Sequence, residues 1–200
     1  MTSRGGLNRG AFLLLYAGIV VLPLVLAKLA RDLERDFASD LATGLGIAAY
    51  AMLLVSFVVT GRFEVARARP GEEPNTSFHR LVGVAATAML IGHVLVSMAS
   101  DRDPIPLAWI GLVVLLLLVA ASLLGRRMRL RYEVWRVSHG LAAVIVAIAG
   151  FIHATDDGSY SSAGAMSAFW AILLVVALAS LVVARARARR PESAPPTVGG

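Results

Sequence analysis

The sequence contains no cysteine, and this absence removes several classes of site at once. Disulfides, thiolate metal sites, cysteine-ligated iron–sulfur clusters and covalent c-type haem attachment all require cysteine. Lysine is nearly absent too, since Lys28 is the single lysine among nineteen basic residues. Charged residues make up only 16% of the 200 residues, whereas hydrophobic residues make up 58%. A soluble domain of this size could not bury so much apolar surface, so we expect the chain to lie in a lipid bilayer.

Charged side chains are missing altogether from six long apolar runs. Each run is close to the ~20 residues that a helix needs to cross ~30 Å of hydrocarbon, and a backbone in lipid must satisfy its own hydrogen bonds. The sequence therefore predicts an all-α membrane protein, a bundle of six transmembrane helices. The first run is short and contains Pro23, and a basic segment precedes it, so a cleavable signal peptide is an alternative for this stretch. The six runs are residues 11–27, 41–61, 81–100, 105–125, 137–154 and 162–184.

The basic residues predict how the bundle is oriented. With the N-terminus inside, fifteen of the nineteen basic residues lie in inside segments and four in outside segments. Because cytoplasmic loops carry an excess of lysine and arginine, we expect both termini in the cytoplasm and the bundle in a bacterial plasma (inner) membrane. The net charge of +6 then reflects topology, and we expect no nucleic-acid partner. The predicted parts are a cytoplasmic N-terminus (1–10), a six-helix membrane domain (11–184) and a disordered basic cytoplasmic tail (185–200).

All four histidines occur in two stretches, at one shared spacing. His79 and His93 are 14 residues apart, and so are His139 and His153. Fourteen residues of helix make just under four turns and about 21 Å, so the two histidines of each helix lie on about the same face, one near each leaflet. The third and fifth helices both run outward, which places His79 level with His139 on the cytoplasmic side and His93 level with His153 on the outer side. If these residues face each other, they form two stacked bis-histidine sites.

This arrangement favours haem over the other uses of membrane histidines. Two facing imidazole nitrogens about 4 Å apart can bind one porphyrin iron from opposite sides. Zinc or copper would need several ligands around one ion, and a proton path would include buried carboxylates, which the runs lack. A lone histidine in a membrane helix is more often a packing contact, but that does not explain four with matched spacing and depth. Arg80 and Arg136 lie at the cytoplasmic level, where they are candidate partners for haem propionates.

Three segments resemble a known family. The stretches "FHRLVGVAATAMLIGH" (78–93) and "YEVWRVSHGLAAVIVAIAGFIHA" (132–154) resemble the third and fifth helices of the ferric reductase-like transmembrane domain, and "GLGIAAYAMLLVSFVVTGRF" (44–63) is similar to its second. That superfamily includes ferric reductases, NADPH oxidases and the haem membrane subunit of the bacterial periplasmic methionine sulfoxide reductase system. The resemblance covers about residues 38–184. It implies two b-type haems between the third and fifth helices, one held by His79 and His139 and one by His93 and His153.

Many members of that superfamily continue into a cytoplasmic reductase that binds FAD and NAD(P)H, whereas this sequence ends about sixteen residues after its last apolar run. The resemblance therefore implies that the chain is the haem-containing membrane subunit of an oxidoreductase. We assign no catalytic side chain, and we expect FAD or FMN to be bound only by a partner protein. We expect transmembrane electron transfer from a cytoplasmic flavoprotein or quinol to an extracytoplasmic acceptor such as ferric iron, oxygen or a periplasmic oxidoreductase. The alternative left open is a haem-free small transporter or membrane scaffold with structural histidines.

Overall fold

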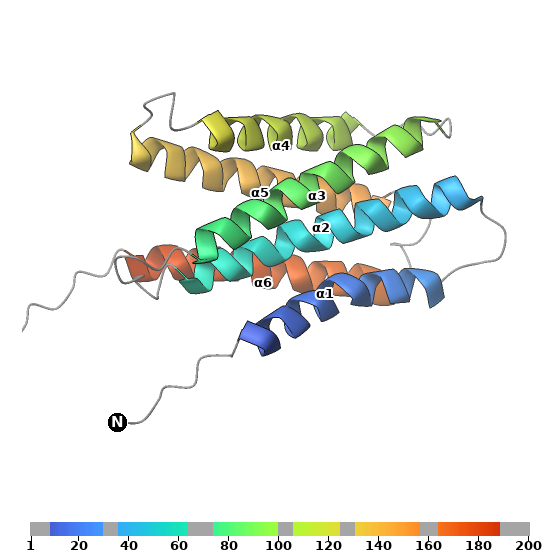
Figure 1. The fold of residues 1–200 in the computed structure, drawn as a ribbon, viewed down its shortest axis with the longest axis horizontal. Helices are drawn as coiled ribbons and strands as arrows, with labels where there is room; N and C mark the ends of the chain where they lie inside the picture. The colour runs from blue at the N-terminus through green and yellow to red at the C-terminus, as the bar shows by residue number, and fades with distance from the viewer. Residues whose placement is uncertain are drawn as a thin grey trace, which may run out of the picture.

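Six helices make up the part of the chain that the structure describes (Figure 1). The computed structural model describes residues 9–29, 36–63, 74–99, 106–124, 131–156 and 164–188. The all-helical fold predicted from the sequence is confirmed over these ranges. Residues 1–8 and 189–200, which hold most of the predicted N-terminal segment and tail, lie outside them. The helices are α1 (Arg9–Leu29), α2 (Phe37–Phe63), α3 (Pro74–Ala99), α4 (Pro106–Leu124), α5 (Tyr132–Asp156) and α6 (Gly164–Ala188).

Five of the six helices are long and apolar enough to cross a membrane. The exception is α1, whose apolar part, Leu13–Leu29, is shorter and includes the buried Pro23. Large hydrophobic side chains are exposed along most of the helices, and they include Leu14, Leu117 and Val175. Such exposure would be costly in water and is expected in lipid. The chain is therefore a multi-pass membrane protein.

The helices begin where local chemistry favours a helix start. Both α3 and α4 begin with proline, which has no backbone N–H to leave unsatisfied at a first helical position. Asp36 precedes α2, and its Oδ1 accepts a 2.9 Å hydrogen bond from the backbone N–H of Ser39. Most of the helices extend past the apolar runs at one or both ends, because a run marks only the hydrocarbon part of a helix. The α6 helix continues to Ala188, into the region predicted to be a disordered tail.

Hydroxyl side chains within the helices bond to the backbone of their own helix. The acceptor is the carbonyl four residues earlier, at 2.7 to 2.9 Å. No hydroxyl of this group has to rely on water for its hydrogen bond, which suits a helix surrounded by lipid. The group consists of Ser56, Thr87, Ser122, Thr155 and Ser180.

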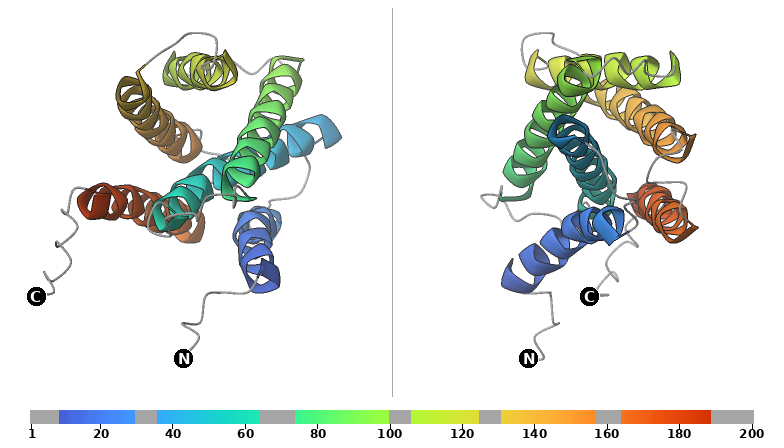
Figure 2. Two further views of the ribbon diagram at one scale, coloured as in Figure 1. Left: turned by 60° about the vertical axis from the view of Figure 1, so that its left-hand side comes forward. Right: turned by 90° about the vertical axis from the view of Figure 1, so that its right-hand side faces the viewer.

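Helix α2 lies at the centre of the bundle. It packs most extensively against α3 and α6 and also contacts α1 and α5. Helices α3 and α5 both lie against α2, and α4 lies on the outside against α5 (Figure 2). Half of the residues in the apolar window of α2 are buried, against 6% for α4. The central helix therefore touches both helices that carry the histidines.

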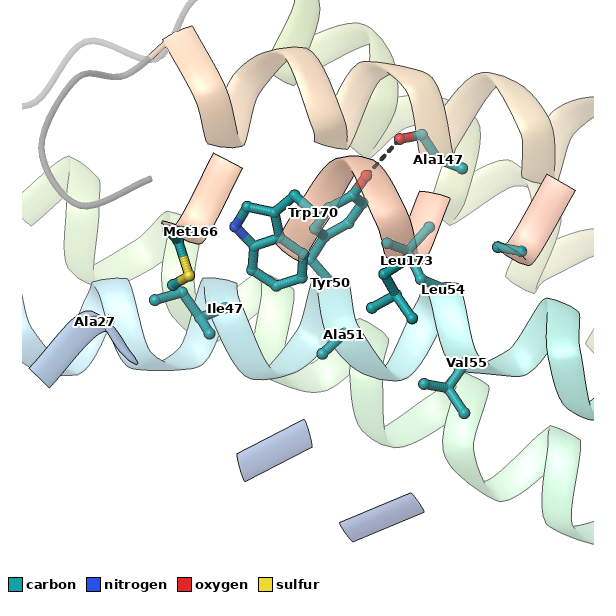
Figure 3. Close-up of a cluster of buried hydrophobic side chains, with 11 residues drawn as sticks. Ala27, Ile47, Tyr50, Ala51, Leu54, Val55, Ala147, Met166, Trp170 and Leu173 are labelled. Carbon is teal, nitrogen blue, oxygen red and sulfur yellow. Dashed lines mark hydrogen bonds between the residues drawn. The ribbon is translucent and has the colours of Figure 1, made fainter. Parts of the chain in front are cut away.

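The main buried cluster joins α2, α5 and α6 (Figure 3). The Tyr50 ring lies 5.0 Å from the Trp170 ring, centre to centre, and Trp170 is fully buried. The Tyr50 hydroxyl donates a 2.8 Å hydrogen bond to the carbonyl oxygen of Ala147. A Cβ atom added at Gly150 would lie 2.6 Å from Cε2 of Tyr50, so the absence of a side chain there admits the ring. This cluster fixes α5 against α2 one turn before His153.

Candidate functional site

The structure brings the four histidines together in the two pairs that the sequence predicted. The ring centres of His79 and His139 are 6.2 Å apart, and those of His93 and His153 are 6.0 Å apart. In both pairs the ring planes are steeply inclined, at 67° and 66°, so the imidazoles are not stacked face to face. One member of each pair comes from α3 and the other from α5. The matching levels follow because the two helices run in the same direction (Figure 1).

The two helices that carry the pairs do not pack against each other. Among the described residues, no Cα atom of α3 lies within 8 Å of a Cα atom of α5. The helices are nevertheless close enough for their imidazoles to meet from opposite sides. Helix α2 contacts both of them on one side, and α4 contacts both on another. The bundle therefore holds two separated helices in a fixed register, with only side chains reaching between them.

The spacing of the paired rings fits ligation of a single iron. Two imidazoles on opposite faces of one metal have ring centres about 6 Å apart, since each metal–nitrogen bond is about 2 Å and each ring centre lies about 1 Å farther out. Each pair would supply two nitrogen ligands, and a porphyrin would supply the other four. No cluster of three or more His, Cys, Asp or Glu side chains suited to a metal ion occurs within the described ranges. The donor set fits haem, and haem ligation itself stays a prediction.

In the His93–His153 pair, the imidazole of His93 contacts the backbone of α2. The Nδ1 atom of His93 lies 2.7 Å from the carbonyl oxygen of Ala42. One turn along α2, a Cβ atom added at Gly46 would lie 2.9 Å from the same nitrogen. Gly92 lies beside the histidine, where an added Cβ would be 3.3 Å from Leu45 Cδ1. The imidazole of His93 therefore packs directly on a face of α2 that carries small side chains.

The His79–His139 pair has different surroundings. The Trp135 ring lies 5.0 Å from the His139 ring, centre to centre. The Ser122 hydroxyl, from α4, is 3.4 Å from Nδ1 of His139, a long and weak contact. The Nδ1 atom of His79 is buried and has no hydrogen-bond partner within the described part of the chain. A buried imidazole nitrogen without a hydrogen-bond partner is costly, so this pair lacks the support that α2 gives to His93.

The arginines predicted to serve haem propionates differ in position. Arg80 is exposed, whereas Arg136 is partly buried. A third arginine was not predicted for this site: Nη2 of Arg185 donates a 3.2 Å hydrogen bond to the carbonyl oxygen of Arg136. A Cβ atom added at Gly140, next to His139, would lie 2.8 Å from the same Nη2 atom. The sequence feature that could have indicated Arg185 for this site is its position as the first basic residue after the apolar part of its helix.

The sequence missed two further residues, Ala42 and Gly46. Both lie in α2, which carries no histidine, so a search for ligands could not reach them. The sequence feature that could have indicated them is a pair of small residues one helical turn apart, a pattern that lets helices approach closely. Such spacing identifies a packing face and does not say what packs on it.

The comparisons with known proteins support the family resemblance. Residues 45–150 match the model of a family described as "Ferric reductase like transmembrane component". This range contains His79, His93 and His139, and His153 follows three residues after its end. The chain is also 27% identical over 148 residues to an uncharacterized protein of Archaeoglobus fulgidus, covering 64% of this chain and 80% of the relative. No solved structure matches the chain.

Proposed function

The chain belongs to the ferric reductase like transmembrane component family, and on that premise we propose that it conducts electrons across a membrane through two b-type haems. Membership of the family suggests transmembrane electron transfer. The two haems are the part of the proposal that we infer from the histidine pairs. His79 and His139 would hold one iron, and His93 and His153 the other. Each haem would supply a one-electron iron couple.

The observation that carries this proposal is the spacing of the two histidine pairs. The ring centres are 6.2 and 6.0 Å apart, yet in the part of the chain that the structure describes no Cα atom of α3 lies within 8 Å of a Cα atom of α5. Histidines that served only to pack the helices together would not need a shared register at both ends of the span. The axial separation of about 21 Å within each helix also divides a membrane of ~30 Å hydrocarbon thickness into short steps.

The side chains have the tasks of holding, orienting and shielding. The four imidazoles would hold the two irons, and the common 14-residue spacing brings the two on α3 opposite those on α5. Arg136 and Arg80, with Arg185, supply positive charge at the level of His79 and His139 for the propionates. The surrounding apolar helices exclude water, which is one of the means by which a protein sets the potential of a haem.

We assign the side of His79 and His139 to the cytoplasm because basic residues concentrate there. The donor would be a cytoplasmic flavoprotein or membrane quinol, with FAD or FMN carried by that partner. The acceptor would be ferric iron, oxygen or a periplasmic oxidoreductase on the other side of the cell membrane. In this scheme the chain is the haem-containing membrane subunit of an oxidoreductase.

The first test is a dithionite-reduced minus oxidised absorption spectrum of the purified protein, with a pyridine haemochrome count. We expect low-spin b-type bands and close to two haems per chain. Protein that was expressed with haem supplied and still contained none would overturn the proposal and favour a haem-free transporter or scaffold.

A double substitution tests the pairing. His93→Ala combined with His153→Ala should remove one haem and leave the other reducible, because the remaining ligands, His79 and His139, belong to the second pair. The matched control is His79→Ala with His153→Ala, which breaks both pairs and should leave neither site with two ligands. Retention of two haems in the first variant would contradict the pairing.

A further inference from the structure

The two histidine pairs differ in the hydrogen bonds made by their ring nitrogens. Nδ1 of His93 lies 2.7 Å from the backbone oxygen of Ala42, a short hydrogen bond. A carbonyl oxygen has no proton to give, so Nδ1 must be the donor. In the neutral ring the lone pair is then on Nε2, the nitrogen left to bind a metal. The contact with α2 therefore selects the tautomer of His93.

Gly46 makes this hydrogen bond possible. A Cβ atom at this position would lie 2.9 Å from Nδ1, 3.0 Å from Cε1 and 3.3 Å from Cγ of His93, distances shorter than ordinary van der Waals contact. The imidazole thus lies directly on the backbone of α2. Any side chain at position 46 would move the ring away from the Ala42 carbonyl. Gly44, two residues earlier on the same helix, has only Leu24 Cδ2 at 4.0 Å and lies under no such restriction.

The His79–His139 pair has no equivalent support among the described residues. Nδ1 of His79 has no hydrogen-bond partner there, and Nδ1 of His139 reaches only the Ser122 hydroxyl at 3.4 Å. That hydroxyl already donates its proton to the Leu118 carbonyl at 2.8 Å. An imidazole whose N–H is firmly hydrogen-bonded to a carbonyl is a more basic ligand than one without such a partner. A more basic ligand stabilises the ferric state relative to the ferrous state.

We infer that Ala42 and Gly46 are positioning residues that make the iron at His93 and His153 the lower-potential member of the two. The inference rests on the proposed function, because it concerns haems held by the same four histidines. Ala42 acts through its backbone oxygen and Gly46 through its lack of a side chain, so neither would be found by a search for ligating side chains. The positive charge of Arg185, close to Gly140, adds to the same difference by favouring the ferrous state at the other pair.

The test is a spectroelectrochemical titration of the full-length protein with both haems bound, comparing Gly46→Ala with the matched control Gly44→Ala. We expect Gly46→Ala to shift the lower of the two midpoint potentials upward and to change one of the two low-spin ferric signals in the electron paramagnetic resonance spectrum. Gly44→Ala should leave both potentials in place. If Gly46→Ala keeps both haems and shifts neither potential, or shifts only the higher one, the inference is wrong.

A second variant covers the case in which Gly46→Ala loses a haem. The haem that remains in that variant, and the haem that remains in His93→Ala with His153→Ala, should both titrate at the higher potential of the unmodified protein. A remaining haem at the lower potential would overturn the assignment. Absence of haem from the unmodified protein would instead remove the proposed function, whereas two haems with unchanged potentials in Gly46→Ala would remove this inference alone.

Discussion

Helices α2 and α4 are both apolar enough to cross a membrane, yet they occupy opposite environments. The α4 helix is the more hydrophobic of the two, and only 6% of its apolar window is buried in the protein, against 50% for α2. The residues that set α2 apart are small or polar, namely Gly46, Ala49, Tyr50 and Ser56. In lipid, hydrophobicity does not drive a helix inward, whereas small residues permit close packing and polar groups seek partners. In this bundle, small and polar residues identify the interior helix better than hydrophobicity does.

The largest test of this comparison replaces one tryptophan in each environment. Trp170 is fully buried against Tyr50, and Trp109, near the start of α4, is 40% exposed. We expect Trp170→Ala to lower the free energy of unfolding by about 3–5 kcal/mol, the usual cost of a buried aromatic truncated to alanine. Trp109→Ala should cost much less. Unfolding in mixed detergent micelles measures both values, and equal losses would contradict the assignment of α4 to the lipid-facing surface.

A glycine pair tests the close approach of α2 to α5. Gly150→Ala places a Cβ atom 2.6 Å from the buried ring of Tyr50, which cannot move aside as a flexible chain end could. We expect a loss of about 1–3 kcal/mol, typical of overpacking. Gly18→Ala, in α1, meets nothing within 4 Å and should be neutral or slightly stabilising, because alanine favours helix over glycine. The same unfolding assay applies, and an unaffected Gly150→Ala would mean that α2 and α5 lie farther apart.

The smallest effect concerns single hydroxyl groups. The Tyr50 hydroxyl donates to the Ala147 carbonyl, whereas the buried Tyr16 hydroxyl has no partner within the described ranges. Removing the first with Tyr50→Phe should cost about 1 kcal/mol, the net value of one hydrogen bond. Removing the second with Tyr16→Phe should cost nothing or stabilise the protein, since a buried unpaired group disappears. Denaturant unfolding of each variant and of the unmodified protein measures both changes in the free energy of unfolding. A larger loss for Tyr16→Phe than for Tyr50→Phe would be inconsistent with the packing of α1.

Sequence reasoning succeeded here where a pattern is periodic and failed where tertiary contact decides. The six helices and the pairing of His79 with His139 followed from apolar runs, loop charge and one repeated spacing. The position of α4 outside the core did not, because a helix that is apolar on every side gives no direction. The contact of His93 with Gly46 could not be predicted from the sequence either. A small residue in a helix predicts close packing but does not identify the neighbour.

Helix ends show the same limit. The apolar runs predicted the third helix at 81–100 and the fifth at 137–154, whereas the helices are Pro74–Ala99 and Tyr132–Asp156. The added turns contain Phe78, His79 and Trp135, so the site at that end lies partly outside the apolar runs predicted from the sequence. Arg185 likewise follows the apolar run of its helix, and its contact with Gly140 depends on how α6 crosses α5.

The fourteen-residue spacing also has an electrical consequence. It separates the two histidine levels by about 21 Å along the helix, roughly two thirds of the ~30 Å of hydrocarbon. Carrying one elementary charge across the whole membrane is worth about 2.3 kcal/mol per 100 mV, so an electron that moved between these levels would exchange about 1.6 kcal/mol per 100 mV with the membrane voltage. An inside-negative voltage would push that electron outward. Two pairs of imidazoles at fixed depths would in this way make the protein's turnover sensitive to the energised state of the cell.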